Sequence, residues 1–196
     1  MEPPELVLAS GNPGKLREIA ALLSMRVIPQ AQFGIAEAEE PHATFLENAL
    51  AKARHASRAA RLPALADDSG LCVEALGGAP GVNSAYYAGR EGGREQRDAR
   101  NNEKLLRNLS ENRRAYYCCV VVLLRHAEDP RPLVAEGLWH GEIARAPRGA
   151  NGFGYDPIFF IPEIQKTAAE LDPAQKNRIS HRGKALAQLL EKLKQC

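Results

Sequence analysis

Short apolar runs alternate with helical patterns in the first part of the chain. The apolar run at residues 6–9 ends at the turn-forming cluster of residues 10–14. Lys15 then opens a pattern with apolar residues on one helical face, and Val27-Ile28 has the character of a second strand. This part of the chain therefore predicts a strand, a tight turn, a helix and another strand.

The next segment predicts a capped helix followed by a strand that ends in acids. Thr44 and Glu47 have the spacing of a capping box, so a helix is expected from there to about Arg61. The apolar run at 65–66 stops at Asp67-Asp68-Ser69-Gly70, and a further strand is expected near residues 71–74. Asp, Ser and Gly are ordinary turn residues, so a simple polar turn between two strands remains an alternative.

The second half predicts further elements of both kinds. They are a charged helix near 94–109, an antiparallel strand pair near 115–126 and 133–143, glycine-rich loops at 77–81 and 149–157, a short helix after Asp172-Pro173, and a last helix capped by Ser180. Strands and helices in this order predict an α/β fold with a mixed, twisted β-sheet and flanking helices. A length of 196 residues suits one domain over 1–196, or two lobes around a shared core.

Composition narrows the functional classes. The net charge of +2 is too small to argue for nucleic acid or an anionic membrane as partner, and no apolar stretch approaches the ~20 residues that a bilayer span needs. The acidic, Pro-rich start shows no secretory signal. Four cysteines, at positions 72, 118, 119 and 196, lack metal-site spacing and are typical of core residues in a reducing compartment. We expect a cytoplasmic protein.

Asp67 and Asp68 are the leading candidates for chemistry. Neighbouring side chains in an extended chain point to opposite faces, so the two carboxylates are not expected to act as one cluster. One can serve as a base or a metal ligand while the other ties down local backbone.

Two predicted helix starts have the character of anion sites. Exposed amides at the start of a helix, with the ammonium of Lys15 nearby, suit a phosphate at residues 10–15, although an ordinary tight turn fits equally well. The segment is not a Walker A loop, because Leu16 follows the lysine. At Ser180-His181-Arg182-Gly183-Lys184 two cations oppose the helix dipole, which favours an anionic partner; the alternative is a solvated basic turn.

Two further segments add to these sites. Phe153-Gly154-Tyr155-Asp156-Pro157 is either a slot in which a base stacks or a loop folded onto the core. Glu37, Glu39 and Glu40 read as a solvated acidic stretch, but one of them with Asp68 could supply the oxygen ligands that Mg²⁺ prefers. Together these features suit a nucleoside triphosphate held with Mg²⁺.

Several ordered blocks resemble the inosine/xanthosine triphosphate pyrophosphatase family, most closely its bacterial members. The blocks are residues 10–15, Thr44-Phe45 with 47–49 and 52–53, 66–71, 76–82, 152–159, 166–170 and 179–184. The resemblance covers nearly the whole chain. It implies two lobes around a central nucleotide-binding cleft, usually in a homodimer, and hydrolysis of ITP, dITP and XTP to the nucleoside monophosphate and pyrophosphate.

The resemblance also implies roles for individual residues. Asp68 resembles the general base and lies at the Mg²⁺ site, and Glu39 would be the second metal-site acid, although Glu40 leaves the register open. The residues implied in substrate binding are Ser10, Gly11, Asn12, Pro13, Gly14, Lys15, Lys52, Ser69, Phe153, Gly154, Tyr155, Asp156, Lys176, His181 and Arg182. One position departs from the pattern, because Tyr86 stands where the bacterial members usually carry Arg.

Two other functions stay open at this point. The basic segment 178–184 and the aromatic loop also suit a module that binds nucleotide or single-stranded nucleic acid without cleaving it. A related pyrophosphatase could instead prefer another base, such as a modified pyrimidine. The leading hypothesis is a pyrophosphatase acting on a small-molecule triphosphate, with no nucleic acid or membrane as partner.

Overall fold

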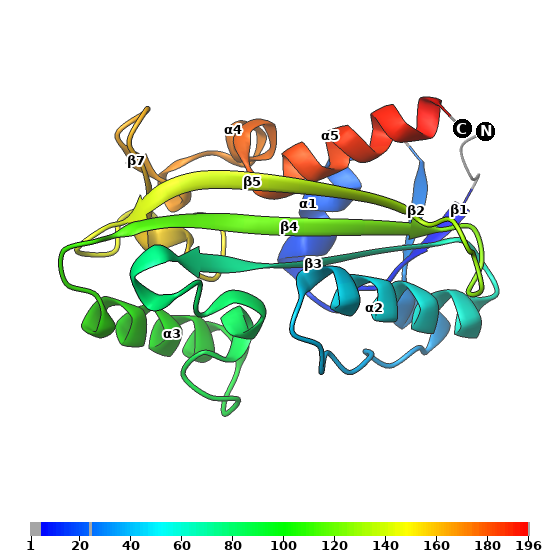
Figure 1. The fold of residues 1–196 in the computed structure, drawn as a ribbon, viewed down its shortest axis with the longest axis horizontal. Helices are drawn as coiled ribbons and strands as arrows, with labels where there is room; N and C mark the ends of the chain where they lie inside the picture. The colour runs from blue at the N-terminus through cyan, green and yellow to red at the C-terminus, as the bar shows by residue number, and fades with distance from the viewer. Residues whose placement is uncertain (1–4, 24, 196) are drawn as a thin grey trace. The chain divides into compact units, whose positions relative to one another are not determined.

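The computed structural model describes residues 5–23 and 25–195, and Figure 1 shows its elements. The predictions for the first four residues and Cys196 lie outside these ranges. The strands are β1 (Glu5–Leu8), β2 (Arg26–Pro29), β3 (Ala64–Val73), β4 (Arg114–Leu124), β5 (Leu133–Ile143), β6 (Phe159–Ile161) and β7 (Lys166–Thr167). The helices are α1 (Pro13–Leu22), α2 (Phe45–Ala60), α3 (Arg94–Asn108), α4 (Pro173–Ile179) and α5 (His181–Lys194).

The described strands pair in the order β2-β1-β3-β4-β5-β6-β7. β1 is parallel to β2 and to β3, whereas β6 is antiparallel to both β5 and β7. The predicted mixed α/β sheet is therefore confirmed. The chain divides into two compact units: unit 1 runs to Asp68 and includes Cys119–Gly137 and the segment from His181, and unit 2 is Ser69–Cys118 with Leu138–Ser180.

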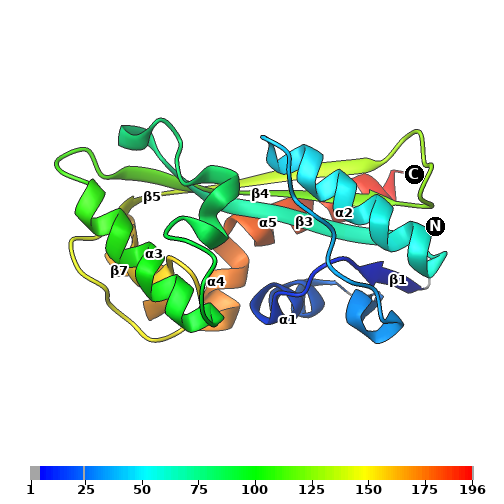
Figure 2. The same cartoon turned by 90° about the horizontal axis from the view of Figure 1, so that it is seen from below.

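In unit 1 the strands are covered on both faces. Figures 1 and 2 show α2 on one face and α5 on the other. Ile19 of α1 and Leu186 and Leu189 of α5 join the strand residues Leu8 and Leu65 in one buried cluster. α2 instead buries small residues, Ala49, Ala53 and Ala56. The small side chains allow α2 to approach the strands closely.

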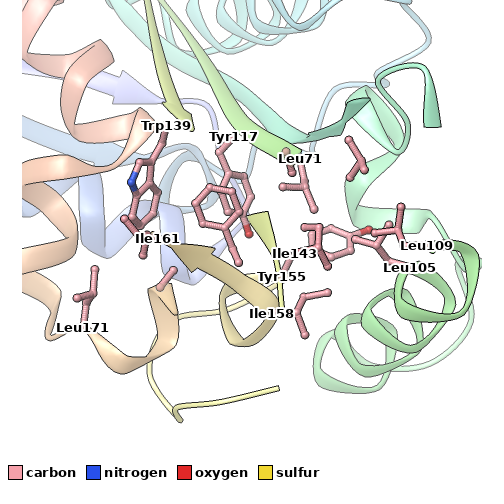
Figure 3. Packing of buried hydrophobic residues seen from close by; sticks show 14 residues of the cluster. Leu71, Leu105, Leu109, Tyr117, Trp139, Ile143, Tyr155, Ile158, Ile161 and Leu171 are labelled. Carbon is pink, nitrogen blue, oxygen red and sulfur yellow. The ribbon is translucent and has the colours of Figure 1, made fainter. Parts of the chain in front are cut away.

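Unit 2 has its own core, shown in Figure 3. Phe159 packs against two aromatic rings, with its centroid 4.7 Å from that of Tyr117 and 5.0 Å from that of Trp139. Leu105 and Leu109 bring α3 onto this cluster. α3 is thereby fixed against the loop that precedes β6.

One local prediction was wrong in a way that matters for the site. Asp67-Asp68-Ser69-Gly70 is not a turn between two strands, because β3 runs without a break from Ala64 to Val73. All of its residues are buried except the half-buried Ser69. Side chains from both faces supply partners for the two acids, so the polar segment stays in the sheet.

Other predictions differ only in their boundaries. α1 begins at Pro13 rather than at Lys15, because Asn12 is its N-cap. α2 is capped by Thr44 as predicted, and Asp172 caps α4. The short strands β6 and β7 were not predicted. Cys72, Cys118 and Cys119 are buried free thiols, as expected.

Candidate functional site

β3 presents its two adjacent acids to opposite faces of the sheet in unit 1. Oδ2 of Asp67 lies 3.0 Å from Nζ of Lys15 and 3.3 Å from Nη2 of Arg182, on the side of α1 and α5. Oδ1 of Asp68 instead accepts a hydrogen bond from Nζ of Lys52 on α2, at 3.1 Å. The prediction that the two carboxylates point to opposite faces and do not form one cluster is confirmed.

Asp68 is held by two residues one turn apart on α2. Nδ2 of Asn48 donates to Oδ2 of Asp68 at 3.3 Å and also to the carbonyl of His42 at 3.3 Å, and Lys52 donates to Oδ1. Residues four apart share one face of a helix, so Asn48 and Lys52 reach the same carboxylate. Asn48 was not among the predicted site residues, although its spacing from Lys52 on a capped helix was a usable signal.

The protonation of this pair follows from burial and charge. Burial raises the pKa of Asp68 above its ordinary value, and this effect outweighs the opposing influence of Lys52 and Lys15. Burial alone would lower the pKa of Lys52, but Asp68, Asp67 and Glu40 outweigh burial and raise it. Lys52 therefore remains a cation beside a carboxylate that takes up a proton more readily than usual.

The acidic stretch before α2 contributes to the same group. Lys52 also forms an ion pair with Glu40; both Glu40 and Glu39, the predicted metal-site acid, are exposed. Among residues 5–23 and 25–195 no three His, Cys, Asp or Glu side chains gather into a metal cluster. Mg²⁺ is usually bound through one or two carboxylates, with water and substrate phosphates completing its ligands, so two acids here fit the ion.

The turn at residues 10–15 is tightly built. Oδ1 of Asn12 accepts from the amides of Gly14 at 2.9 Å and Lys15 at 3.3 Å, and Oγ of Ser10 accepts from the amide of Asn12 at 3.2 Å. A Cβ on Gly11 would lie 1.7 Å from Oε1 of Glu37, so the Glu37 side chain would have to move to admit a larger residue there. Asn12 thus takes two amides that an anion at this helix start would otherwise use, and Lys15 already faces Asp67.

The start of α5 is buried rather than solvated. Arg182 is 1% exposed and His181 is 4% exposed. The guanidinium of Arg182 pairs with Glu18 of α1 as well as with Asp67, and these acids keep its pKa raised although burial alone would lower it. The alternative of a solvated basic turn is wrong for these two residues. Arg182 cross-links the start of α5, α1 and β3.

The aromatic loop, residues 153–157, belongs to unit 2, and its two aromatic side chains differ in burial. Tyr155 is buried in the core of Figure 3 and its hydroxyl donates to the carbonyl of Ser84 at 2.9 Å. Phe153 is only half-buried, and Nζ of Lys176 lies 4.7 Å from its ring centroid. The core explanation therefore holds for Tyr155, while the ring of Phe153 keeps an accessible part.

Asp156 organises this loop. Its Oδ2 accepts from the amide of Phe153 at 2.8 Å and from Nζ of Lys176 at 2.6 Å. Lys176 and Asp156 are both buried, so each neutralises the other's charge. Ser69, the remaining predicted binding residue of unit 2, is half-buried on β3.

A buried carboxylate held by a lysine and an asparagine in a mixed α/β sheet makes a polar, charged candidate site of the kind that α/β enzymes use. A model of the Ham1 family matches residues 6–192. The chain belongs to the Ham1 family, which confirms the resemblance drawn from the motifs.

Individual relatives match over nearly their full length. The chain is 65% identical over 193 residues to the "dITP/XTP pyrophosphatase" of Burkholderia pseudomallei, covering 96% of this chain and 92% of the relative. It is 62% identical over 194 residues to the protein of the same name from Ralstonia nicotianae, covering 96% of each chain. The solved structure of a HAM1 protein from Coxiella burnetii superposes with a TM-score of 0.89, at 51% identity, covering 98% of this chain and 99% of that one.

Proposed function

We propose that this chain hydrolyses non-standard purine nucleoside triphosphates, dITP and ITP together with dXTP and XTP, to the nucleoside monophosphate and pyrophosphate. The observation that carries the proposal is the buried carboxylate of Asp68, held by Lys52 and Asn48. It stands in a chain whose relatives are named dITP/XTP pyrophosphatase. Such a reaction removes unwanted bases from the pool used for DNA and RNA.

Asp68 acts as the general base in this proposal. It takes a proton from water as the water oxygen bonds to the α-phosphorus, and the bond from that phosphorus to the bridging oxygen breaks to release pyrophosphate. A pKa raised by burial makes the carboxylate a better proton acceptor than an exposed one. General-base catalysis of this kind contributes about 10²–10⁴-fold in rate.

A divalent ion, Mg²⁺, belongs to the proposal. Asp68 and one acid of the Glu39-Glu40 pair would hold it, and Glu40 already shares Lys52 with Asp68. When bound, the ion neutralises charge on the phosphates. We expect EDTA to abolish pyrophosphate release and excess Mg²⁺ to restore it, whereas unchanged release in EDTA would remove the ion from the account.

The turn at residues 10–15 and Lys52, all in unit 1, are assigned to the phosphates. Lys15 is 13% exposed in its side chain and lies at the turn of residues 10–14, and Lys52 is beside Asp68. Ser10 to Lys15 and Lys52 would contact the phosphates. His181 and Arg182 would complete the nucleotide site, and Arg182 also ties α5 to β3 through Asp67.

The base is assigned to residues of unit 2: Ser69, Phe153 to Asp156, and Lys176. Phe153 is only half-buried and its ring suits stacking, since every base has a π-face. Hypoxanthine and xanthine carry a 6-keto acceptor where adenine carries an amino donor. A buried donor left facing that amino group costs about 1–3 kcal/mol, which gives up to about a hundredfold discrimination.

Cellular setting and assembly complete the proposal. A cytoplasmic homodimer acting on free triphosphates is expected. None of the helices that the structure describes is long and apolar enough to cross a membrane. Size-exclusion chromatography with light scattering tests the dimer, and a monomer at micromolar concentration would contradict it.

A panel of triphosphates at fixed Mg²⁺ tests the function. We expect pyrophosphate to be released from dITP and XTP much faster than from dATP or dGTP. Equal rates on all of them, or orthophosphate as the first product, would contradict the proposal. Faster turnover of a modified pyrimidine triphosphate would also contradict it and assign another base preference.

A further inference from the structure

Both peptide groups of Gly154 are held by side chains of α3. The amide of Gly154 donates to Oδ2 of Asp98 at 2.9 Å, and its carbonyl accepts from Nδ2 of Asn102 at 3.0 Å. Asp98 and Asn102 are four residues apart, so they lie on one face of the helix. All three residues belong to unit 2.

The hydrogen bonds from α3 restrict the backbone of Gly154, which glycine's conformational freedom would otherwise leave mobile among several conformations. Its φ of +64° is in the left-handed region, which glycine adopts readily but which leaves the chain free to take others. Gly152, two residues earlier, also has a positive φ, of +77°. A Cβ on Gly152 would lie 2.0 Å from Oδ2 of Asp156, so the loop is also tightly folded there. Fixing Gly154 fixes the path of the chain next to Phe153.

Asn102 makes this contact at a cost to the fold. It is 8% exposed, and among the described residues its Oδ1 has no hydrogen-bond partner. A buried acceptor without a partner is destabilising, and an apolar side chain of similar shape would avoid it. The neighbouring Asn101 differs, because its amide bonds the backbone of residues 84, 85 and 88. The side chain of Asn102 is therefore divided, because its amide nitrogen supports Gly154 while its oxygen has no hydrogen-bond partner among the described residues.

We propose that Asp98 and Asn102 are positioning residues for base recognition, acting through Gly154 on the ring of Phe153. The inference rests on the proposed function, which places the base at Phe153 to Asp156. Gly154 is anchored on α3, and Phe153 is anchored on its other side by the bond from its amide to Asp156. The ring is thereby presented in one orientation before the substrate arrives, which lowers the entropy cost of stacking.

Four variants test this inference: Asp98→Ala, Asp98→Asn, Asn102→Ala and, as a matched control, Asn108→Ala on the exposed side of the same helix. Steady-state kinetics with dITP and dGTP are measured with the melting temperature of each variant. Asp98→Ala and Asn102→Ala are expected to raise KM for dITP about tenfold, with kcat within about twofold of the wild-type value. Asp98→Asn is expected to recover most of the wild-type KM, because its amide oxygen still accepts from Gly154.

The outcomes separate the inference from the function. A purely structural role would lower the melting temperature and the amount of active enzyme without changing KM, and that result would overturn the inference. So would a KM in Asn108→Ala that rises as far as in Asn102→Ala. Should Asn102→Ala fold poorly, Asn102→Leu fills the space and removes the same donor, and an unchanged KM there would overturn the inference. A wild-type protein that releases no pyrophosphate from dITP would contradict the proposed function, and the inference with it.

Discussion

Nη2 of Arg182 lies 3.3 Å from Oδ2 of Asp67, and neither side chain reaches solvent. Removing one partner of a buried ion pair leaves an uncompensated charge, which typically costs about 3–5 kcal/mol. Asp67→Asn is therefore expected to lower the free energy of unfolding by roughly this amount, measured by urea denaturation of the metal-free protein. Asp172→Asn is the control, because asparagine caps a helix as well as aspartate does.

The same pair predicts a dependence of stability on pH. Burial alone would raise the pKa of Asp67, but Lys15 and Arg182 outweigh it and hold this pKa below its usual range. A pKa lowered by folding contributes stability above the unfolded value, about 3.9, and loses it as the pH falls. The difference between wild type and Asp67→Asn should be largest near neutral pH and shrink on acidification. A difference that grows below pH ~4 would contradict this charge state.

Lys52 sets the acid side of the activity profile. The carboxylate form of Asp68 is the base, so activity should fall as the pH drops through a pKa that burial has raised. The positive charge of Lys52 lowers the pKa of Asp68 and so opposes the effect of burial. Removing that charge should raise the pKa of Asp68 further. Lys52→Met is expected to move the acid limb of kcat to higher pH. Lys166→Met, at an exposed position, should leave the limb in place, and an unmoved limb in Lys52→Met would separate Lys52 from the base.

Phe153 should affect binding more than the chemical step. Stacking of a base on an aromatic ring is worth about 1–3 kcal/mol, so Phe153→Leu is expected to raise KM for dITP roughly tenfold to a hundredfold. The value of kcat should change little, because the reacting phosphate is remote from the base. Phe33→Leu in unit 1, at an exposed phenylalanine, is the matched control. A fall in kcat with KM unchanged would contradict the assignment.

Local patterns predicted most of the elements. Thr44 with Glu47 and Asp172 with Pro173 mark helix starts because capping depends on residues a few positions apart. The continuous strand through Asp67 to Gly70 could not be predicted in the same way. Its polar residues are typical of a turn, and only partners from α1, α2 and α5 allow them to remain in a buried strand.

In the candidate site too, local sequence patterns predicted some features, whereas others depend on contacts between distant residues. Asp68 and the turn at residues 10–15 were singled out because they belong to a series of ordered blocks that resembles a known family, since each motif taken alone also fits an ordinary turn. The partnership of Lys52 with Glu40 rather than Glu39 depends on how an irregular segment crosses α2. The hold of Asp98 and Asn102 on Gly154 joins residues more than fifty positions apart, and no local pattern indicates it.

The most direct test of the account is pyrophosphate release from dITP by Asp68→Asn, measured beside wild type at the same Mg²⁺ concentration, with dITP binding by the variant measured in parallel. We expect release to fall by about 10²–10⁴-fold while the variant still binds dITP, because the amide cannot accept the proton of the attacking water. Asp172→Asn should retain the wild-type rate. Release by Asp68→Asn close to the wild-type rate would contradict the assignment of Asp68 as the base.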